Sequence, residues 1–399
     1  MLHQLITAAL LLLLLAVAEP AAWAQAPRRA PSGPRALAVV EMLSNKRARL
    51  VPVAIRVENR FYDANLYSAK PRPIAVDFDT LYDVLRTGEP VGTFTVGSAS
   101  RVNGLWLAGG KFDPKKDESA PAEVRVGTSP ATTGADDEDK PPILRKPGAS
   151  SDPAARKEAP SASTPEPETA GKPAQEVATQ SDMGNDPSRP TLRRGKPTDS
   201  SSEVLPFKDV PGLTVIETLT AISDATRTEY RPFTFEMKKE EQAKFAQEAT
   251  GMALEAITRF ASTHATSGVP ATGPLADVSL RVFDLDLGNQ PIIVLSGRKP
   301  ALARGAKNTA PPDPNLDFYV TVVARTDIYG NMRRLFTHVT DKPHMDSVPK
   351  LELIDAVDAE GVGRGQLLFR QVFDGERSFI LYRVGADKLW PLFEGAAGH

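Results

Sequence analysis

The chain has no cysteine among its 399 residues. This absence excludes a disulfide framework, so any folded part must be held by apolar burial and hydrogen bonding. An excess of charge of one sign is also missing, because the net charge is −2 at pH 7. A chain without a positive balance has no bulk attraction for nucleic acid or for anionic lipid, and we expect neither as a partner.

Aromatic residues are absent between Phe112 and Phe207, where proline, alanine, serine, threonine and charged residues dominate. Such a stretch buries too little apolar surface to offset its conformational entropy. We therefore predict a disordered linker over residues 113–203, joining two modules that move independently.

Two short basic pieces of this linker echo each other. Residues 142–147 read PILRKP and residues 190–197 read PTLRRGKP. Each is bounded by proline and anchored by leucine, as in a short recognition motif for an acidic partner. The alternative is that these charges only keep the linker solvated.

Long apolar runs are missing with one exception, residues 5–18. This run is too short to span a bilayer comfortably, and small residues follow it. We interpret residues 1–24 as a secretory signal peptide and expect an exported protein, periplasmic or extracellular, without stable membrane insertion after cleavage. An uncleaved anchor is the alternative, because no lysine or arginine precedes the run.

Signatures of several enzyme classes are missing as well. The chain contains no Gly-x-Ser-x-Gly elbow, His-Glu-x-x-His helix, Walker loop or dinucleotide fingerprint. The cluster His338, Asp341, His344 and Asp346 offers nitrogen and oxygen ligands for a metal or an acid–base site. The alternative interpretation of this cluster is an exposed loop between strands.

The residue pattern predicts β structure in two parts of the chain, 35–112 and 204–399. In residues 35–112, apolar residues alternate at period two over 51–57, and turn signals separate several further short runs. This pattern predicts a small β-barrel or sandwich. Its aromatic residues are expected mainly in the core rather than in a ligand groove: Phe61, Tyr62, Tyr67, Phe94 and Trp106.

Residues 204–399 are predicted to form a C-terminal β-rich domain. Thr220–Asp224 recurs loosely as Val323–Asp327, which suggests two copies of one antiparallel unit. Apolar residues at the 3.6-residue period predict a helix over about 238–262, packed on the sheet, so this part is α+β.

One loop of this domain carries a resemblance. The run from Asp358 through Glu360, Gly361 and Gly363 to Gln366 resembles the calcium loops of FG-GAP and VCBS repeats. The resemblance implies that Asp358 and Glu360 hold calcium, which takes several oxygen ligands. The alternative is that the glycines serve turn geometry. The wider C-terminal segment is similar to uncharacterised exported proteins of acidobacterial type, and this similarity implies no activity.

These features favour a non-enzymatic envelope protein whose two β modules, on a flexible tether, bind a protein or a glycan. The first alternative is a hydrolase acting on envelope polymers through C-terminal carboxylates, with Asp355 and Asp358 as the most suggestive pair. The second is calcium-dependent adhesion. No cofactor other than calcium is expected, and the ligand and the oligomeric state stay open.

Overall fold

The computed structural model describes residues 33–66, 68–69, 72–102, 104–115, 192–195, 213–224, 229–264, 266–307, 309–327 and 329–396. The predicted signal peptide, residues 1–24, lies outside these residues, and so does most of the predicted linker, 113–203. The described part is mainly β, with one α-helix, and this confirms the predicted fold class. No helix in it is both long enough and apolar enough to cross a membrane.

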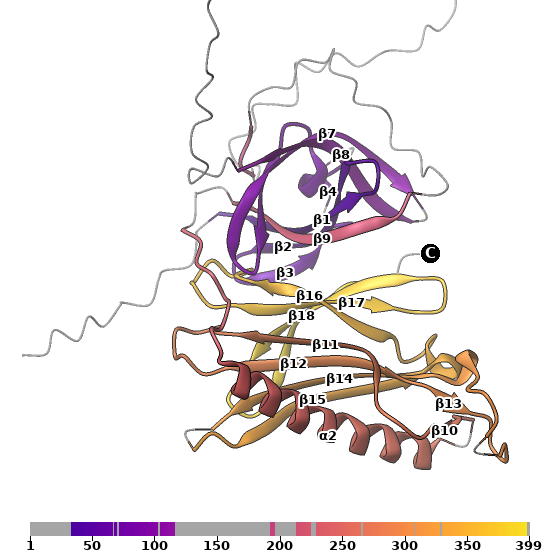
Figure 1. Cartoon of the computed structure of the whole chain (residues 1–399). Helices are drawn as coiled ribbons and strands as arrows, with labels where there is room; N and C mark the ends of the chain where they lie inside the picture. The colour runs from indigo at the N-terminus through magenta and orange to yellow at the C-terminus, as the bar shows by residue number, and fades with distance from the viewer. Residues whose placement is uncertain are drawn as a thin grey trace, which may run out of the picture. The chain divides into compact units, whose positions relative to one another are not determined.

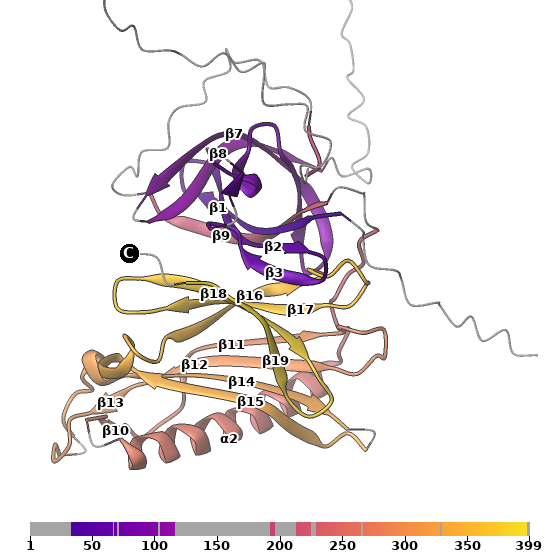
Figure 2. The same cartoon turned by 180° about the vertical axis from the view of Figure 1, so that it is seen from behind.

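The N-terminal region forms a closed barrel of six antiparallel strands (Figures 1 and 2). The strands follow the order β1-β9-β6-β7-β8-β2, and pairing of β1 with β2 closes the ring. The short strand β3 continues the sheet from β2. The barrel strands and β3 have these bounds: β1 (Arg35–Leu43), β2 (Ala48–Val57), β3 (Arg60–Asp63), β6 (Leu81–Arg86), β7 (Glu89–Val102), β8 (Leu105–Pro114) and β9 (Val215–Asp224). The strands β4 (Ser68–Ala69) and β5 (Arg72–Pro73) and the 3₁₀ helix η1 (Ile74–Val76) lie between β3 and β6 in the chain.

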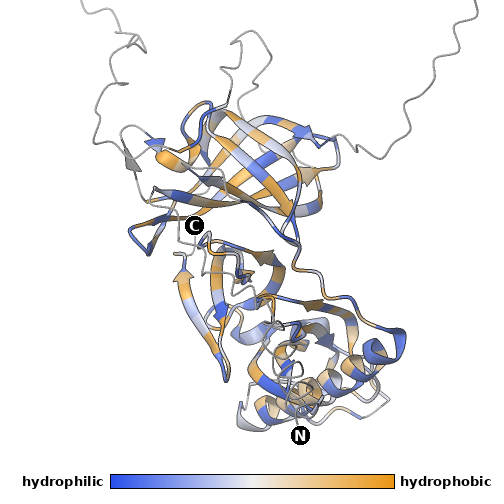
Figure 3. Ribbon diagram, turned by 90° about the vertical axis from the view of Figure 1, so that its left-hand side faces the viewer, coloured by the Kyte–Doolittle hydropathy of each residue, from blue (hydrophilic) through white to orange (hydrophobic). Residues whose placement is uncertain are grey.

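Strand β1 is apolar along most of its length because both of its faces are buried. Its residues Ala36, Ala38 and Val40 belong to the core that also contains Tyr82 and Phe94. The alternate residues of β1 belong to a second core, outside the barrel. Both faces of the strand are therefore buried, and such strands are apolar throughout rather than alternating. Figure 3 shows apolar and polar residues alternating along other barrel strands.

The sixth barrel strand, β9, comes from beyond the predicted linker. It pairs with β1 at nine positions, from Arg35 with Asp224 to Leu43 with Val215, and with β6 at three. The sequence assigned these residues to the C-terminal domain. The chain therefore leaves the barrel after β8 and re-enters the same sheet as β9, so the predicted linker connects two strands of one barrel.

The C-terminal part contains two four-stranded antiparallel sheets and a helix. The first sheet has the order β11 (Ala276–Phe283), β12 (Ile292–Lys299), β14 (Phe318–Thr326) and β15 (Met332–Asp341). The second has the order β16 (Lys350–Val357), β17 (Gln366–Val372), β18 (Arg377–Val384) and β19 (Leu389–Glu394). The short elements are β10 (Val269–Pro270), β13 (Ala301–Leu302), η2 (Pro314–Leu316) and η3 (Lys342–His344).

Helix α2 (Lys239–Thr263) covers one face of the first sheet, close to the predicted bounds (Figure 1). Its buried residues recur at the helical period and pack against sheet residues such as Leu295 and Val320. The helix begins with a hydrogen bond of 2.9 Å from the backbone N–H of Lys238 to the carboxylate of Glu241. This bond satisfies a donor that has no partner within the helix.

The barrel and the two sheets belong to one compact unit. An apolar core joins the first sheet to the second, and another joins the second sheet to the barrel. Buried polar contacts cross the same boundary, including a hydrogen bond of 2.6 Å from Arg35 to the carbonyl of Asp358. Burial on this scale opposes the independent movement of two modules that the sequence suggests.

Candidate functional site

A row of polar side chains crosses the first sheet on the face opposite the helix. Ser279 on β11 pairs directly with Ser296 on β12, Ser296 pairs with Thr321 on β14, and Thr321 pairs with His338 on β15. Directly paired residues of antiparallel strands point to the same face. The register therefore collects three hydroxyl groups and an imidazole in one line.

Pro349 and the start of β16 cover one half of this row. The hydroxyl of Thr321 donates to the carbonyl of Leu351 at 3.2 Å, and the imidazole Nε2 of His338 bonds the carbonyl of Pro349 at 2.6 Å. These bonds satisfy the polar groups that the crossing chain buries. Ser279 and Ser296 lie beyond the crossing, where the row opens into a groove.

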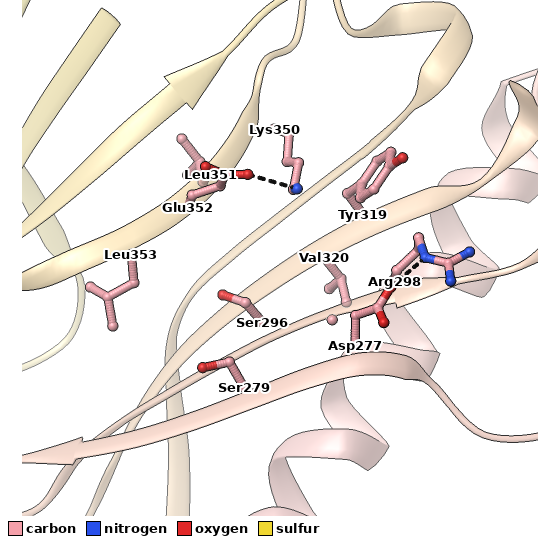
Figure 4. Close-up of a pocket in the computed structure, with 11 residues that line it drawn as sticks. Asp277, Ser279, Ser296, Arg298, Tyr319, Val320, Lys350, Leu351, Glu352 and Leu353 are labelled. Carbon is pink, nitrogen blue, oxygen red and sulfur yellow. Dashed lines mark hydrogen bonds and ion pairs between the residues drawn. The ribbon is translucent and has the colours of Figure 1, made fainter. Parts of the chain in front are cut away.

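The groove has a volume of about 400 Å³ and lies between the first sheet and the start of β16. In Figure 4, Lys350 and Glu352 line the β16 side, and Ser296 and Arg298 line the sheet. Tyr319 stands at one end, with the Lys350 ammonium 5.0 Å from the centre of its ring. This volume falls in the range typical of small-molecule sites.

Two ion pairs line the groove. Arg298 binds Asp277 at 2.7 Å and Asp317 at 2.6 Å, and the bonds to these two carboxylates raise the pKa of the arginine further. Lys350 bonds Glu352 at 2.8 Å. Burial alone would raise the pKa of Glu352, but bonds from Lys350 and Arg370 and their charges hold it below its usual range. Glu352 is therefore ionised at neutral pH and unsuited to donate a proton as a general acid.

The predicted calcium residues lie in a loop closed by hydrogen bonds. The carboxylate of Asp358 accepts the backbone N–H groups of Gly361, Val362 and Gly363 at 2.7, 3.1 and 2.6 Å. Glu360 forms an ion pair with Arg383 at 2.5 Å. Within the described ranges, no group of three or more histidine, aspartate or glutamate residues is placed to hold a metal ion. The carboxylates of Asp358 and Glu360 are therefore both bound by groups of the protein itself.

Asp355, the other half of the suggested hydrolytic pair, is buried where the second sheet meets the barrel. Its carboxylate accepts the backbone N–H of Thr87, in the turn between β6 and β7, at 2.6 Å. It also binds Arg281 at 2.5 Å. Its oxygens are thus occupied in joining three parts of the fold, away from the groove.

The histidine cluster divides into two separate environments. His338 bonds Pro349 and stacks on Phe336. His344 bonds the carboxylate of Asp341, and its Nε2 lies 2.9 Å from the hydroxyl of Thr266, next to the end of α2. The carboxylate of Asp341 also accepts the backbone N–H of His344 and so begins η3. The fourth member of the predicted cluster, Asp346, is exposed.

We expect His338 to make folding stability depend on pH. Burial lowers its pKa, although the bond to the carbonyl of Pro349 acts in the opposite direction. The unfolded chain then binds a proton more readily than the folded chain, so stability is lost as pH falls through about 6.5 toward the folded pKa. We expect His338→Gln to flatten the fall in urea midpoint between pH 7 and pH 5. An unchanged slope in the variant would show that other groups carry the effect.

No motif in the sequence marks the groove residues Ser279, Ser296 and Lys350 as site residues. A signal was present in β11, where Asp277, Ser279 and Arg281 alternate with apolar residues. Their partners on other strands are distant in sequence, so only the strand register brings them together. Comparisons of the chain with protein-family profiles, with curated proteins and with solved structures found no match.

Proposed function

We propose that the chain is an exported, non-enzymatic binding protein that holds an envelope glycan in the groove between the first sheet and β16. The export step rests on the leader-like residues 1–24. The observation that carries the proposal is the groove itself, which is lined by the hydroxyl groups of Ser279 and Ser296 and by two ion pairs, Arg298 with Asp277 and Lys350 with Glu352.

The chemistry of the lining suits a ligand rich in hydroxyl groups. The hydroxyls of Ser279 and Ser296 can both donate and accept hydrogen bonds, so they match sugar hydroxyls in either direction. Ion-paired side chains at the rim offer further donors and acceptors without an unpaired charge. The Tyr319 ring supplies an apolar surface for the face of a sugar ring and a hydroxyl at its edge.

The lining argues for binding rather than hydrolysis. A glycosidase needs one carboxyl group that is protonated at working pH and a second that is ionised. Both groove carboxylates, Asp277 and Glu352, are paired with cations, and the pKa of Glu352 is lowered. Glu352 is therefore unsuited to the role of the protonated carboxyl group.

A variant at Tyr319 tests the proposal. We expect the intact protein to bind oligosaccharides released from bacterial cell envelopes, measured on an array and then by calorimetry. Tyr319→Ala should weaken this binding about tenfold, equal to about 1.4 kcal/mol, because the sugar loses its aromatic contact.

The matched control is Tyr329→Ala, since Tyr329 is 82% exposed in a turn between β14 and β15. It should bind as the unaltered protein does. Equal losses in the two variants, or no glycan bound by the unaltered protein, would refute the assignment.

A further inference from the structure

Residues 192–195 form a short extended segment that lies on the barrel beside β6. The backbone N–H of Leu81 donates to the carbonyl of Arg193 at 2.8 Å, and the N–H of Gly195 donates to the carbonyl of Asp79 at 2.7 Å. Thr80 and Arg194 form an antiparallel bridge. The segment is therefore held as an added strand, in the way that many peptides bind to sheet edges.

The edge is available because β9 covers only part of β6. The two strands pair at Asp83, Val84 and Leu85, and β9 ends at Asp224. Among the described residues, 79–81 bond residues 193–195 on this side and do not pair with β9. An edge with unpaired backbone groups is a template for another extended chain.

Three side chains anchor the segment. Leu192 is 5% exposed and joins the barrel core. The guanidinium of Arg193 binds both oxygens of Asp83, at 2.5 and 2.8 Å. Arg194 binds Asp77 at 2.7 Å. The barrel therefore recognises the sequence Leu-Arg-Arg through one apolar contact and two acidic groups. The bidentate pair of Arg193 with Asp83 adds geometric specificity.

The same anchors recur once elsewhere in the chain, in residues 142–146, which lie outside the described residues. Leu144 matches Leu192, Arg145 matches Arg193 and Lys146 matches Arg194. The match ends at Pro147, which stands where Gly195 donates its N–H to Asp79. Proline has no N–H, so that backbone bond is lost in the second sequence.

We propose that the barrel edge from Asp77 to Asp83 is a peptide-binding site for Leu-Arg-Arg or Leu-Arg-Lys, and that residues 142–146 are its second occupant. One edge holds one added strand, so the two motifs exclude each other. The inference does not depend on the glycan groove, whose residues lie in other strands. The second motif binds more weakly, because it lacks one backbone bond and presents lysine in place of a forked arginine.

Peptide binding to a variant with a vacated edge tests the proposal. The full chain carrying Leu192→Ser, Arg193→Ser and Arg194→Ser loses the apolar anchor and both acidic contacts, which leaves the edge free for an added peptide. Labelled peptides of residues 188–198 and 140–149 are titrated, and fluorescence anisotropy reports binding. We expect both to bind the variant at least tenfold more tightly than the unaltered chain, where the tethered segment competes. The 188–198 peptide should bind about tenfold more tightly than the 140–149 peptide.

Two controls separate recognition from general charge attraction. A 140–149 peptide with Arg145→Ala and Lys146→Ala should not bind, and adding Asp83→Asn to the variant should remove binding of the natural peptides. Circular dichroism checks that each protein is folded, and Leu192→Ser alone, which removes only the apolar anchor, should give a smaller gain in peptide binding than the triple substitution. The proposal is overturned if the natural 140–149 peptide binds no better than its altered form.

Discussion

A chain that ends after residue 116 is expected not to fold. It would contain five of the six barrel strands and lack β9, leaving β1 and β6 without the neighbour that pairs with both. Buried residues of β9, including Ala221 and Ile222, would be lost from the two cores that meet at the barrel wall. An open barrel exposes apolar surface and two sheet edges. Circular dichroism should show no cooperative melting transition.

The complementary experiment supplies β9 on a separate chain. Residues 25–150 and residues 151–399, expressed together, contain all the described strands between them. We expect them to co-purify as a one-to-one complex that melts in a single transition, because β1 and β9 pair at nine positions. A fragment of residues 25–116 that folds alone would contradict the assignment of β9 to the barrel.

The second large effect is expected at Glu41, a buried carboxylate on β1. It binds Arg49 on β2 at 2.5 Å and Arg377 on β18 at 2.9 Å, and its side chain is 0% exposed. Glu41→Ala removes the negative charge that Arg49 binds within the barrel and that Arg377 binds across the boundary between the barrel and the second sheet. Removing one partner of a buried ion pair typically destabilises a protein by about 3–5 kcal/mol. Urea denaturation should show a midpoint lowered accordingly.

Glu217 provides the matched control for Glu41. It lies on β9, also binds an arginine, Arg86 at 2.5 Å, and has a side chain that is 42% exposed. Exposed ion pairs contribute about 0–1 kcal/mol, so Glu217→Ala should shift the midpoint little. If the urea midpoint fell by a similar amount in the two variants, burial of Glu41 would not be the reason that its ion pairs stabilise the protein.

The sequence predicted elements whose period is visible within one segment. The helix near 238–262 and the strand over 51–57 each show their own repeat of apolar residues. The predicted small barrel is present, but its sixth strand could not be assigned by local pattern. The run 215–224 looks like any half-buried strand, and its partners on β1 are about 180 residues earlier in the chain.

The candidate site was harder to predict for the same reason. Polar residues of three separate strands become a groove only through the antiparallel register. The acidic loop at Asp358 illustrates the opposite problem, since a carboxylate followed by glycines is typical both of a metal loop and of a turn held by backbone N–H groups. The spacing of residues does not distinguish a metal loop from such a turn. In the structure, three backbone N–H groups donate to the carboxylate of Asp358, which is the arrangement of a turn.

The late position of β9 in the chain also governs the order in which the protein can assemble. Arg35 and Asp224 form an ion pair across a separation of 189 residues, so β1 cannot gain this neighbour until most of the barrel strands have been made. Contacts of such long sequence separation slow folding. During that interval the edges of β1 and β6 remain open to pairing with other chains. Until β9 has been made, the competing outcome for these open edges is aggregation rather than closure of the barrel.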